Sequence, residues 1–237
     1  MGFADKEHID FAEGEILAFD KPLHWTSFDL VAKVRHTICR AIGQKKLKVG
    51  HSGTLDPLAT GVVVVCTGRK TKLIDQLQYD DKEYVATLQL GATTPSFDME
   101  HPVDQTYPTA HITRALIDDV IPQFVGKQWQ VPPMYSAVWV DGKRAYQMAR
   151  KGETAELKPK LLVIDEIEVL AFDPETMLLT IRVVCSKGTY IRALARDIGE
   201  RLGSGAYLTA LRRTRVGAIR IEDCMTIDDF LGMMNQE

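Results

Sequence analysis

The chain has 237 residues, of which 45% are hydrophobic, and a formal net charge of -3 at pH 7. That length and apolar fraction suit one large domain or two packed subdomains that fold without covalent cross-links. The four cysteines lie far apart with no Cys-x-x-Cys pair, which argues against a zinc site and a disulfide framework. A polar N-terminal segment and the lack of a long apolar run argue against a signal peptide and a membrane span, so we expect a cytoplasmic protein.

The charged residues are unevenly distributed along the chain. Basic clusters occur at residues 45–48, 69–72, 143–144, 150–151 and 212–215, and acidic clusters at residues 98–100, 118–119 and 165–166. Taken singly, each basic cluster is typical of a solvated surface. Several of them beside one site would suit the phosphates of a nucleic acid.

The first predicted elements are a strand and a helix. Residues 15–20 are apolar enough for a strand, which should end before Pro22. Ser27 is the predicted N-cap of the following helix, and Gly43 lies after its predicted end. Apolar residues recur in this helix at the spacing of one buried face, at Leu30, Val31, Val34, Ile38 and Ile42.

Two short strands, over residues 47–50 and 62–65, are predicted on either side of a glycine-rich loop. The run of four valines in the second strand indicates burial on both faces. A longer strand over residues 84–90 and a helix over residues 110–124, capped by Thr109, should follow.

The second half of the chain is predicted to return to strands after an irregular excursion over residues 131–152. The turn Asp141-Gly142 and a short basic helix near residues 145–150 fall within it. The remaining predicted elements are a hairpin of strands 161–172 and 177–185, a helix over 190–202 and a strand over 208–216. Because hairpins dominate, we expect an α+β fold with a mixed, mostly antiparallel central sheet flanked by helices.

The glycine-rich loop holds one acidic residue, Asp56. Gly50, Gly53 and Gly61 permit tight turns, while Pro57 fixes its own φ and disfavours helical geometry at Asp56. The carboxylate should therefore point in one direction, as a catalytic group requires. An Asx turn or a helix cap would explain the same Asp-Pro pair without any catalytic role.

A second candidate group begins where a predicted buried strand ends, at residues 185–192. Its glycine turn places Tyr190 and Arg192 in the first turn of a helix. A cation is disfavoured at a helix N-terminus, so Arg192 should have an anionic partner, for which Asp56 is the candidate. Otherwise Arg192 would be a surface residue and Tyr190 a core aromatic.

Further motifs follow in a fixed order along the chain. They are Lys21-Pro22 with Thr26-Ser27, Gly50-His51-Ser52-Gly53-Thr54-Leu55-Asp56-Pro57 with Ala59-Thr60-Gly61, Thr71-Lys72-Leu73, Lys82-Glu83-Tyr84, Val131-Pro132-Pro133-Met134-Tyr135-Ser136-Ala137, Ala145-Tyr146 with Ala149-Arg150-Lys151-Gly152, Ser186-Lys187-Gly188-Thr189-Tyr190-Ile191-Arg192, and Leu211-Arg212-Arg213. Together these motifs resemble the TruB-type tRNA pseudouridine synthases. Trp139 stands where that family usually has Lys, Ser52 stands where it usually has Thr, and residues 94–101 diverge from it.

The resemblance implies a pseudouridine-synthase fold and an isomerase that converts uridine to pseudouridine in the T loop of tRNA, at tRNA position 55. The N1–C1′ glycosidic bond breaks and C5 joins C1′, with no metal and no cofactor. Asp56 is implied as the catalytic carboxylate, with Arg192 as its ion-pair partner and Tyr84 as the residue that stacks on the flipped base. Attack on C1′, addition to the uracil ring and removal of a ribose proton all stay open as the role of Asp56.

Three further residues match substrate-binding positions of the resembled family. His51 is implied to contact RNA near the flipped nucleotide, and Tyr190 and Leu211 are implied to line the uracil pocket. From the residues alone, the ordinary explanations are a hydrogen-bonded loop histidine at His51 and core packing at Leu211.

In the resembled family, the region over residues 131–152 forms a thumb that closes over an RNA stem-loop, and we call it the thumb segment. Its mixture of cations and aromatics suits RNA, because extruding a uridine costs about a few kcal/mol that such contacts offset. The expected domains are an N-terminal extension (1–13), a catalytic domain (14–225) and a short C-terminal tail (226–237) in place of the PUA-like domain of many bacterial members. We expect a monomer whose partner is the tRNA T stem-loop, with no membrane partner and no metal.

Two other functions fit part of the pattern. An RNA-binding or tRNA-folding protein would keep the same scaffold with turnover secondary. A nucleoside or glycoside hydrolase is disfavoured, because most glycosidases need a second carboxylate and no second acid stands in a comparable loop. Comparing RNA binding with turnover separates the first alternative from the synthase, and free uracil as a product would indicate the second.

Overall fold

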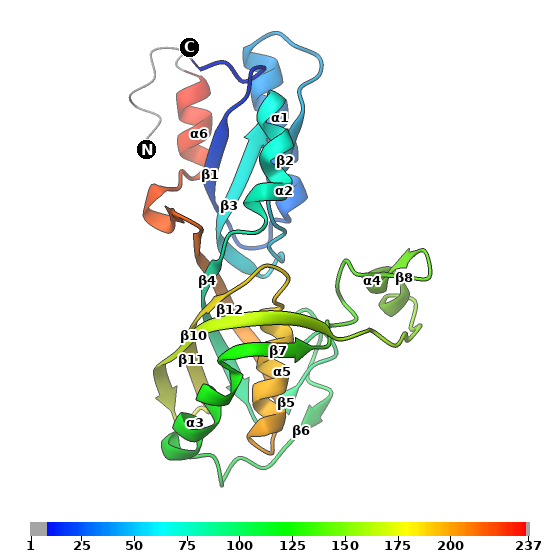
Figure 1. Ribbon diagram of the computed structural model, residues 1–237, viewed down its shortest axis with the longest axis vertical. Helices are drawn as coiled ribbons and strands as arrows, with labels where there is room; N and C mark the ends of the chain where they lie inside the picture. The colour runs from blue at the N-terminus through cyan, green and yellow to red at the C-terminus, as the bar shows by residue number, and fades with distance from the viewer. Residues whose placement is uncertain (1–8, 236–237) are drawn as a thin grey trace. The chain divides into compact units, whose positions relative to one another are not determined.

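A computed structural model describes residues 9–235 of the chain (Figure 1). The chain divides into two compact units: unit 1 contains the described parts of Met1–Tyr84 and Arg212–Glu237, and unit 2 contains Val85–Leu211. The division falls inside two strands, β4 and β12, so each of these strands contributes to both units. Most of the expected N-terminal extension, residues 1–8, and the last two residues of the expected tail lie outside the described residues.

Unit 1 is built on β3, in which every residue from Val62 to Cys66 is at most 1% exposed. The strands of this unit are β1 (Ile16–Lys21), β2 (Val49–His51), β3 (Ala59–Thr67), the start of β4 (Lys82–Leu90), the end of β12 (Ala206–Val216) and β13 (Ile219–Arg220). β3 lies between β1 and β12, and β1 and β2 both pair with it antiparallel. The predicted burial of 62–65 on both faces is confirmed, and this buried strand supports the loop that precedes it.

The helices of unit 1 are α1 (Ser27–Ala41), η2 (Gly68–Leu73), α2 (Ile74–Leu77), η4 (Ile221–Asp223) and α6 (Ile227–Met234). The prediction of Ser27 as the N-cap of α1 is wrong, because Thr26 is the cap. The hydroxyl of Thr26 accepts a hydrogen bond from the Asp29 N–H at 3.0 Å, and the Asp29 carboxylate accepts one from the Thr26 N–H at 2.9 Å. Asp29 thus completes a capping box with Thr26, which leaves the Ser27 side chain free for another contact.

Residues 226–235 belong to unit 1, where α6 packs against the rest of the unit. The ring of Phe230 on α6 meets the ring of Phe19 on β1 edge to face, with centroids 5.4 Å apart, and both side chains are fully buried. Such a pair adds about 0.5–1.5 kcal/mol beyond the apolar area that it buries. Most of the expected C-terminal tail is therefore part of the folded core of this unit.

Unit 2 is built on long strands in the order β12–β4–β11–β10–β7, in which β10 pairs antiparallel with both β11 and β7. Its further elements are β5 (Ala92–Thr93), β6 (Gln105–Thr106), α3 (Arg114–Val120), η3 (Ile121–Phe124), β7 (Gly126–Gln130), β10 (Lys160–Asp173), β11 (Leu178–Cys185) and α5 (Ile191–Arg201). The predicted hairpin is confirmed as β10 and β11, with Ile164 opposite Cys185 and Asp173 opposite Leu178. The mostly antiparallel sheet with flanking helices confirms the expected α+β class.

The helix predicted over residues 110–124 is shorter than expected. Its N-cap is Thr113, whose hydroxyl accepts a hydrogen bond from the Leu116 N–H, and not Thr109, which closes a separate turn with Ile112. After Val120 the helix tightens to 3-10 geometry, because Pro122 has no N–H to donate. The strand β7 that follows was not predicted.

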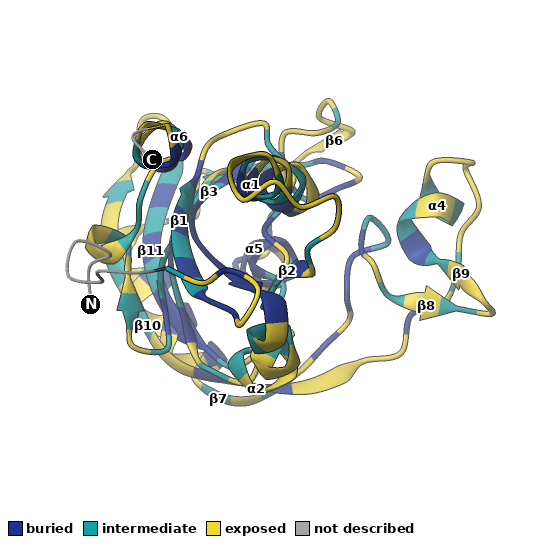
Figure 2. Ribbon diagram, turned by 90° about the horizontal axis from the view of Figure 1, so that it is seen from above, coloured by how far each residue is buried: buried dark blue, intermediate teal, exposed yellow. Residues whose placement is uncertain are grey.

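The thumb segment belongs to unit 2 and holds β8 (Trp139–Val140), β9 (Lys143–Arg144) and α4 (Ala145–Ala149). The predicted turn is confirmed, since Asp141 and Gly142 both have positive φ and join β8 to β9. Figure 2 shows this segment apart from the sheet of unit 2, with mostly exposed and half-buried residues. It therefore has little core of its own, and many of its side chains are exposed.

Candidate active site

The backbone around Asp56 is fixed by hydrogen bonds on both sides. The Ala59 N–H donates to the Asp56 carbonyl at 3.0 Å, and the His24 N–H donates to the Pro57 carbonyl at 2.8 Å. Asp56 itself is half-buried. The loop over residues 52–59 therefore holds its carboxylate on a constrained backbone, as the glycine and proline pattern predicted.

The side chain of Ser27 reaches from α1 to this loop. Its hydroxyl accepts a hydrogen bond from the Leu55 N–H at 2.8 Å and donates one to the Leu55 carbonyl at 3.2 Å. Ser27 is 2% exposed and Leu55 is 3% exposed, so water does not compete for these bonds. One hydroxyl thus satisfies both backbone groups of the residue that precedes Asp56.

Arg213 reaches the same loop from β12, and the residue as a whole is 2% exposed. Its Nη2 donates to the Gly53 carbonyl at 3.1 Å and its Nη1 to the Thr54 carbonyl at 3.4 Å. Its Nε donates to the Val62 carbonyl on β3 at 2.7 Å. The guanidinium therefore joins the start of the Asp56 loop to the strand that follows it.

Lys21, at the end of β1, is fully buried, and its ammonium donates to the carbonyls of Pro22 at 2.9 Å and Trp25 at 2.6 Å. Burial lowers the pKa of Lys21 to about 8, although the negative charge of Asp56 acts in the opposite direction. Lys21 is thus a buried cation that interacts electrostatically with Asp56.

His51 lies at the end of β2, half-buried, and its Nδ1 accepts a hydrogen bond from the Gly53 N–H at 3.2 Å. Burial, and then the charge of Arg213, lowers the pKa of His51 below its ordinary value. Because Nδ1 accepts the bond from Gly53, the neutral ring carries its proton on Nε2, and that N–H is a hydrogen-bond donor.

Tyr84 lies on β4 and is 8% exposed. With Asp56 and His51 it belongs to unit 1, whereas Arg192 and Tyr190, at the start of α5, belong to unit 2. Leu211, on β12, is the last residue of unit 2 and is half-buried. The expected ion pair between Asp56 and Arg192 stays a prediction.

Arg192 is 5% exposed and is held by the backbone of two loops of unit 2. Its Nη1 donates to the Ser96 carbonyl at 3.2 Å, and its Nη2 donates to the Tyr135 carbonyl at 2.9 Å. Its Nε lies 3.6 Å from the carboxylate of Asp98. The alternative that Arg192 is a surface residue is therefore wrong, because the side chain is buried.

Asp98 is an acidic residue beside Arg192 that the sequence analysis did not single out as a functional candidate. Its Oδ1 accepts hydrogen bonds from the Ser96 hydroxyl at 2.6 Å and from the Glu100 N–H at 2.9 Å. The Thr94 hydroxyl donates to its carbonyl at 2.6 Å. The loop over residues 94–101 thus forms a buried cradle for Arg192.

Tyr190 is the N-cap of α5, and the side chain of Gln130 fixes its backbone. The Gln130 amide oxygen accepts a hydrogen bond from the Tyr190 N–H at 2.9 Å, and its amide nitrogen donates to the Tyr190 carbonyl at 3.2 Å. This bidentate contact ties the end of β7 to the start of the helix that holds Arg192.

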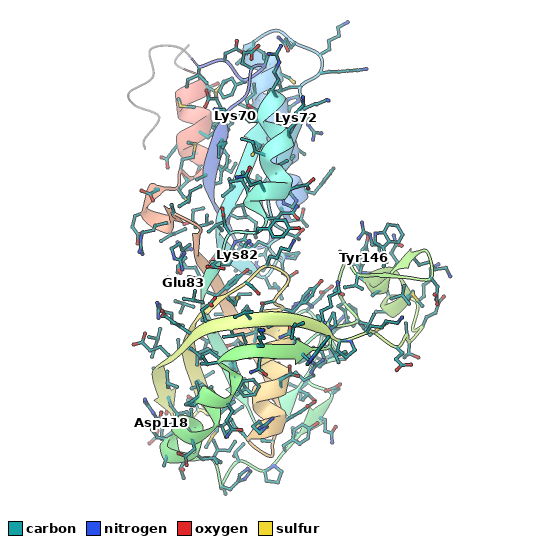
Figure 3. All side chains as sticks on the ribbon, in the orientation of Figure 1. Lys70, Lys72, Lys82, Glu83, Asp118 and Tyr146 are labelled. Atoms are coloured by element: carbon teal, nitrogen blue, oxygen red, sulfur yellow. The ribbon has the colours of Figure 1, made fainter. Side chains whose placement is uncertain are left out.

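The thumb segment presents cations stacked on aromatic rings. The guanidinium carbon of Arg144 lies 4.1 Å from the centre of the Trp139 ring, and that of Arg150 lies 5.5 Å from the centre of the Tyr146 ring. Trp139 is 61% exposed, and Figure 3 shows Tyr146 on the same segment. Exposed aromatic faces beside guanidinium groups suit both the bases and the phosphates of RNA.

Residues 9–235 contain neither a candidate metal site nor a candidate membrane span. Among these residues, no group of three or more His, Cys, Asp and Glu side chains is placed to hold a metal ion. No helix in this part of the chain has the length and apolar character needed to cross a membrane.

Known proteins match the chain along most of its length. Residues 40–191 match the sequence model of the TruB family pseudouridylate synthase N-terminal domain, and residues 192–237 match that of the tRNA pseudouridylate synthase B C-terminal domain. A protein of Phocaeicola vulgatus named tRNA pseudouridine synthase B is 62% identical over 97% of this chain and 97% of its own length. A protein of Bacteroides thetaiotaomicron with the same name is 64% identical over 94% of this chain and 93% of its own length.

Solved structures resemble the chain as well. A chain in the crystal structure of a Cbf5-Nop10-Gar1 complex has a TM-score of 0.69 and 30% identity over 94% of this chain and 54% of its own. A chain in the structure of an H/ACA RNP bound to a substrate RNA containing 2'-deoxyuridine has a TM-score of 0.66 and 27% identity, over 94% and 53%. This chain therefore spans about half the length of those chains. The match of residues 40–191 and the near-complete alignment with relatives above 60% identity show that the chain belongs to the TruB family of pseudouridylate synthases.

Proposed function

We propose that this chain isomerises uridine to pseudouridine in tRNA, at position 55 of the T loop, with Asp56 as the reacting carboxylate. The reaction breaks the N1–C1′ bond and joins C5 to C1′; C5 loses its proton and N1 takes one up, so that substrate and product are isomers. The relatives named tRNA pseudouridine synthase B support the substrate class. The observation that carries the proposal is the loop over residues 52–59, whose hydrogen bonds at the Asp56 and Pro57 carbonyls fix the backbone of Asp56.

Tyr84 and Arg192 are proposed as further catalytic residues, in line with the family motifs that contain them. The buried position of Arg192 supports this role, because burying a guanidinium costs desolvation free energy and its hydrogen bonds hold it in one position. Asp98 is proposed as a positioning residue that orients Arg192.

The thumb segment is proposed to bind the T stem-loop while the target uridine is flipped out of its stack. The exposed Trp139 and the two cation–aromatic pairs support this role, since stacking is worth about 1–3 kcal/mol per base. His51, Tyr190 and Leu211 are proposed as contacts to the flipped nucleotide. A cytoplasmic, monomeric enzyme completes the proposal.

The test is to incubate the protein with an unmodified tRNA transcript and to locate pseudouridine by mass spectrometry of nuclease fragments. The proposal predicts one pseudouridine, in the T loop, from the full tRNA and from the isolated T-arm hairpin. Tight RNA binding without pseudouridine would favour the RNA-binding protein instead. Release of free uracil would favour the hydrolase.

A further inference from the structure

The backbone of the Asp56 loop is held by two side chains that come from outside it. Ser27 on α1 binds both backbone groups of Leu55, and Arg213 on β12 binds the carbonyls of Gly53 and Thr54. The bonds therefore fall on the three residues that directly precede Asp56. Neither side chain belongs to the catalytic or substrate-binding sets proposed above.

Both contacts are of the kind that fixes a conformation. Leu55 is 3% exposed, so breaking its bonds to Ser27 would leave buried backbone groups without water to replace the lost partner. The third bond of Arg213, to Val62, anchors its guanidinium to β3, where the chain is fully buried. Movement of residues 53–55 therefore requires bonds from two buried side chains to break together.

The approach of β12 to β3 leaves little freedom for the guanidinium to move away. A Cβ on Gly61 would lie 2.1 Å from the Arg213 carbonyl oxygen, so only glycine fits between the two backbones at this point. Gly61 has a φ of 111°, a conformation that other residues rarely adopt. The backbone of Arg213 is thus fixed against β3, the strand that directly follows the loop that its side chain holds.

We propose that Ser27 and Arg213 are positioning residues for Asp56, which set the direction of its carboxylate without touching the substrate. The inference rests on the proposed function, in which Asp56 is the reacting group. A displacement of about 1 Å in a reacting group lowers a rate by up to about a hundredfold. Loss of either side chain should therefore lower the chemical rate and leave RNA affinity nearly unchanged.

Each positioning residue has a neighbour of the same or similar type that faces elsewhere. Thr26 caps α1 through Asp29, and Arg212 pairs with Asp20, with an Nη2 to Oδ2 distance of 2.8 Å. The hydroxyl of Thr26 binds Asp29, and the guanidinium of Arg212 binds Asp20 and Thr60. Among residues 9–235 neither side chain binds residues 53–55, so each serves as a control for general effects of its substitution. The pairs Thr26 with Ser27 and Arg212 with Arg213 therefore separate positioning from stability.

The first experiment compares Ser27→Ala with Thr26→Ala in single-turnover assays at saturating enzyme, with tRNA labelled at uridine C5. Ser27→Ala should lower the rate between about tenfold and a hundredfold, with the Kd for tRNA within about twofold of wild type. Thr26→Ala should lower the melting temperature and leave the rate within about twofold. Thermal melts and the stoichiometry of tRNA binding establish that each variant is folded in the assay.

The second experiment compares Arg213→Lys with Arg212→Lys, which both keep the positive charge. A lysine cannot reproduce three bonds from one planar guanidinium, so Arg213→Lys should lower the single-turnover rate at least about tenfold and leave Kd nearly unchanged. Arg212→Lys should match the wild-type rate. Folded Ser27→Ala and Arg213→Lys proteins with wild-type rates would overturn the inference.

The outcome for the wild type separates this inference from the proposed function. If wild type forms no pseudouridine, or if Asp56→Asn is as active as wild type, the proposed function fails and the inference fails with it. If wild type is active, Asp56→Asn is inactive and the four variants are equally active, only the inference fails. A rise in Kd without a fall in rate would also contradict it, because it would place Ser27 or Arg213 in RNA binding.

Discussion

The Nε atom of Arg192 lies 3.6 Å from the Oδ2 atom of Asp98, and only 6% and 10% of the two side chains are exposed. Removing one partner of a buried pair leaves an uncompensated charge, so Asp98→Ala should lower the free energy of unfolding by about 3 kcal/mol. Asp98→Asn keeps an acceptor for Ser96 and Glu100 and should lose less. Urea unfolding measures both variants, and wild-type stability in Asp98→Ala would contradict the buried pair.

The buried ammonium of Lys21 should make stability depend on pH. The pKa of Lys21 is about 8 in the folded chain, against an ordinary value of 10.5 when unfolded. Between these two pH values the unfolded state binds more protons than the folded state, so the free energy of unfolding should rise with pH. Above both pKa values the total rise amounts to about 1.4 kcal/mol for each unit by which the two pKa values differ. Lys21→Met should lack this rise.

Urea unfolding of wild type and Lys21→Met at about pH 7.5 and about pH 9 measures this difference, because groups common to both proteins cancel. A stability difference that does not change with pH would count against a buried, titrating Lys21. Asp56→Asn removes the negative charge that raises the pKa of Lys21, so the rise should begin at lower pH in that variant.

His51 should be neutral near pH 7, with its proton on Nε2. The bond from the Gly53 N–H occupies Nδ1, and burial lowers the pKa of the ring. Long-range nitrogen–proton NMR spectra of the imidazole distinguish the two tautomers and the charged form. An imidazolium, or a proton on Nδ1, would show that the loop holds His51 in a different way.

Trp139 should contribute to RNA affinity and not to the chemical step. It is 61% exposed and lies against Arg144, so Trp139→Ala should raise the Kd for a T-arm hairpin about tenfold and leave the single-turnover rate at saturation unchanged. Trp129→Ala is the control, because Trp129 is also exposed, at 71%, but lies on β7 outside the thumb segment. Equal affinities of the two variants for the T-arm hairpin would contradict the proposal that the thumb segment binds RNA through Trp139.

The sequence predicted elements well where periodicity or burial determined them. The apolar run at residues 62–65 and the alternating strand at 84–90 lie in β3 and β4, and the long hairpin is β10 with β11. The N-cap at Thr26 was missed although the sequence contains its signal, since Asp29 stands three residues after Thr26 and no acid stands three residues after Ser27. The 3-10 end after α3 also had a signal, in Pro122.

The long-range contacts of the site had no comparable signal. Asp98 contacts Arg192, and Ser27 and Arg213 bind the backbone of the Asp56 loop, all across large separations along the chain. Local spacing predicts which face a residue occupies, but it does not predict which distant carbonyl a buried side chain will meet. The motifs therefore identified candidate reacting groups and missed the residues that hold them.

The most direct measurement is tritium release from an unmodified tRNA transcript labelled at uridine C5, with wild type and Asp56→Asn compared at saturating enzyme. Isomerisation replaces the C5 hydrogen by C1′, so release follows bond formation at that carbon. Wild type should release tritium, with pseudouridine at position 55, and Asp56→Asn should release none at equal RNA binding. Release by Asp56→Asn at the wild-type rate would show that Asp56 is not the reacting carboxylate, and no release from a wild type that binds the tRNA would show that the chain does not isomerise this substrate.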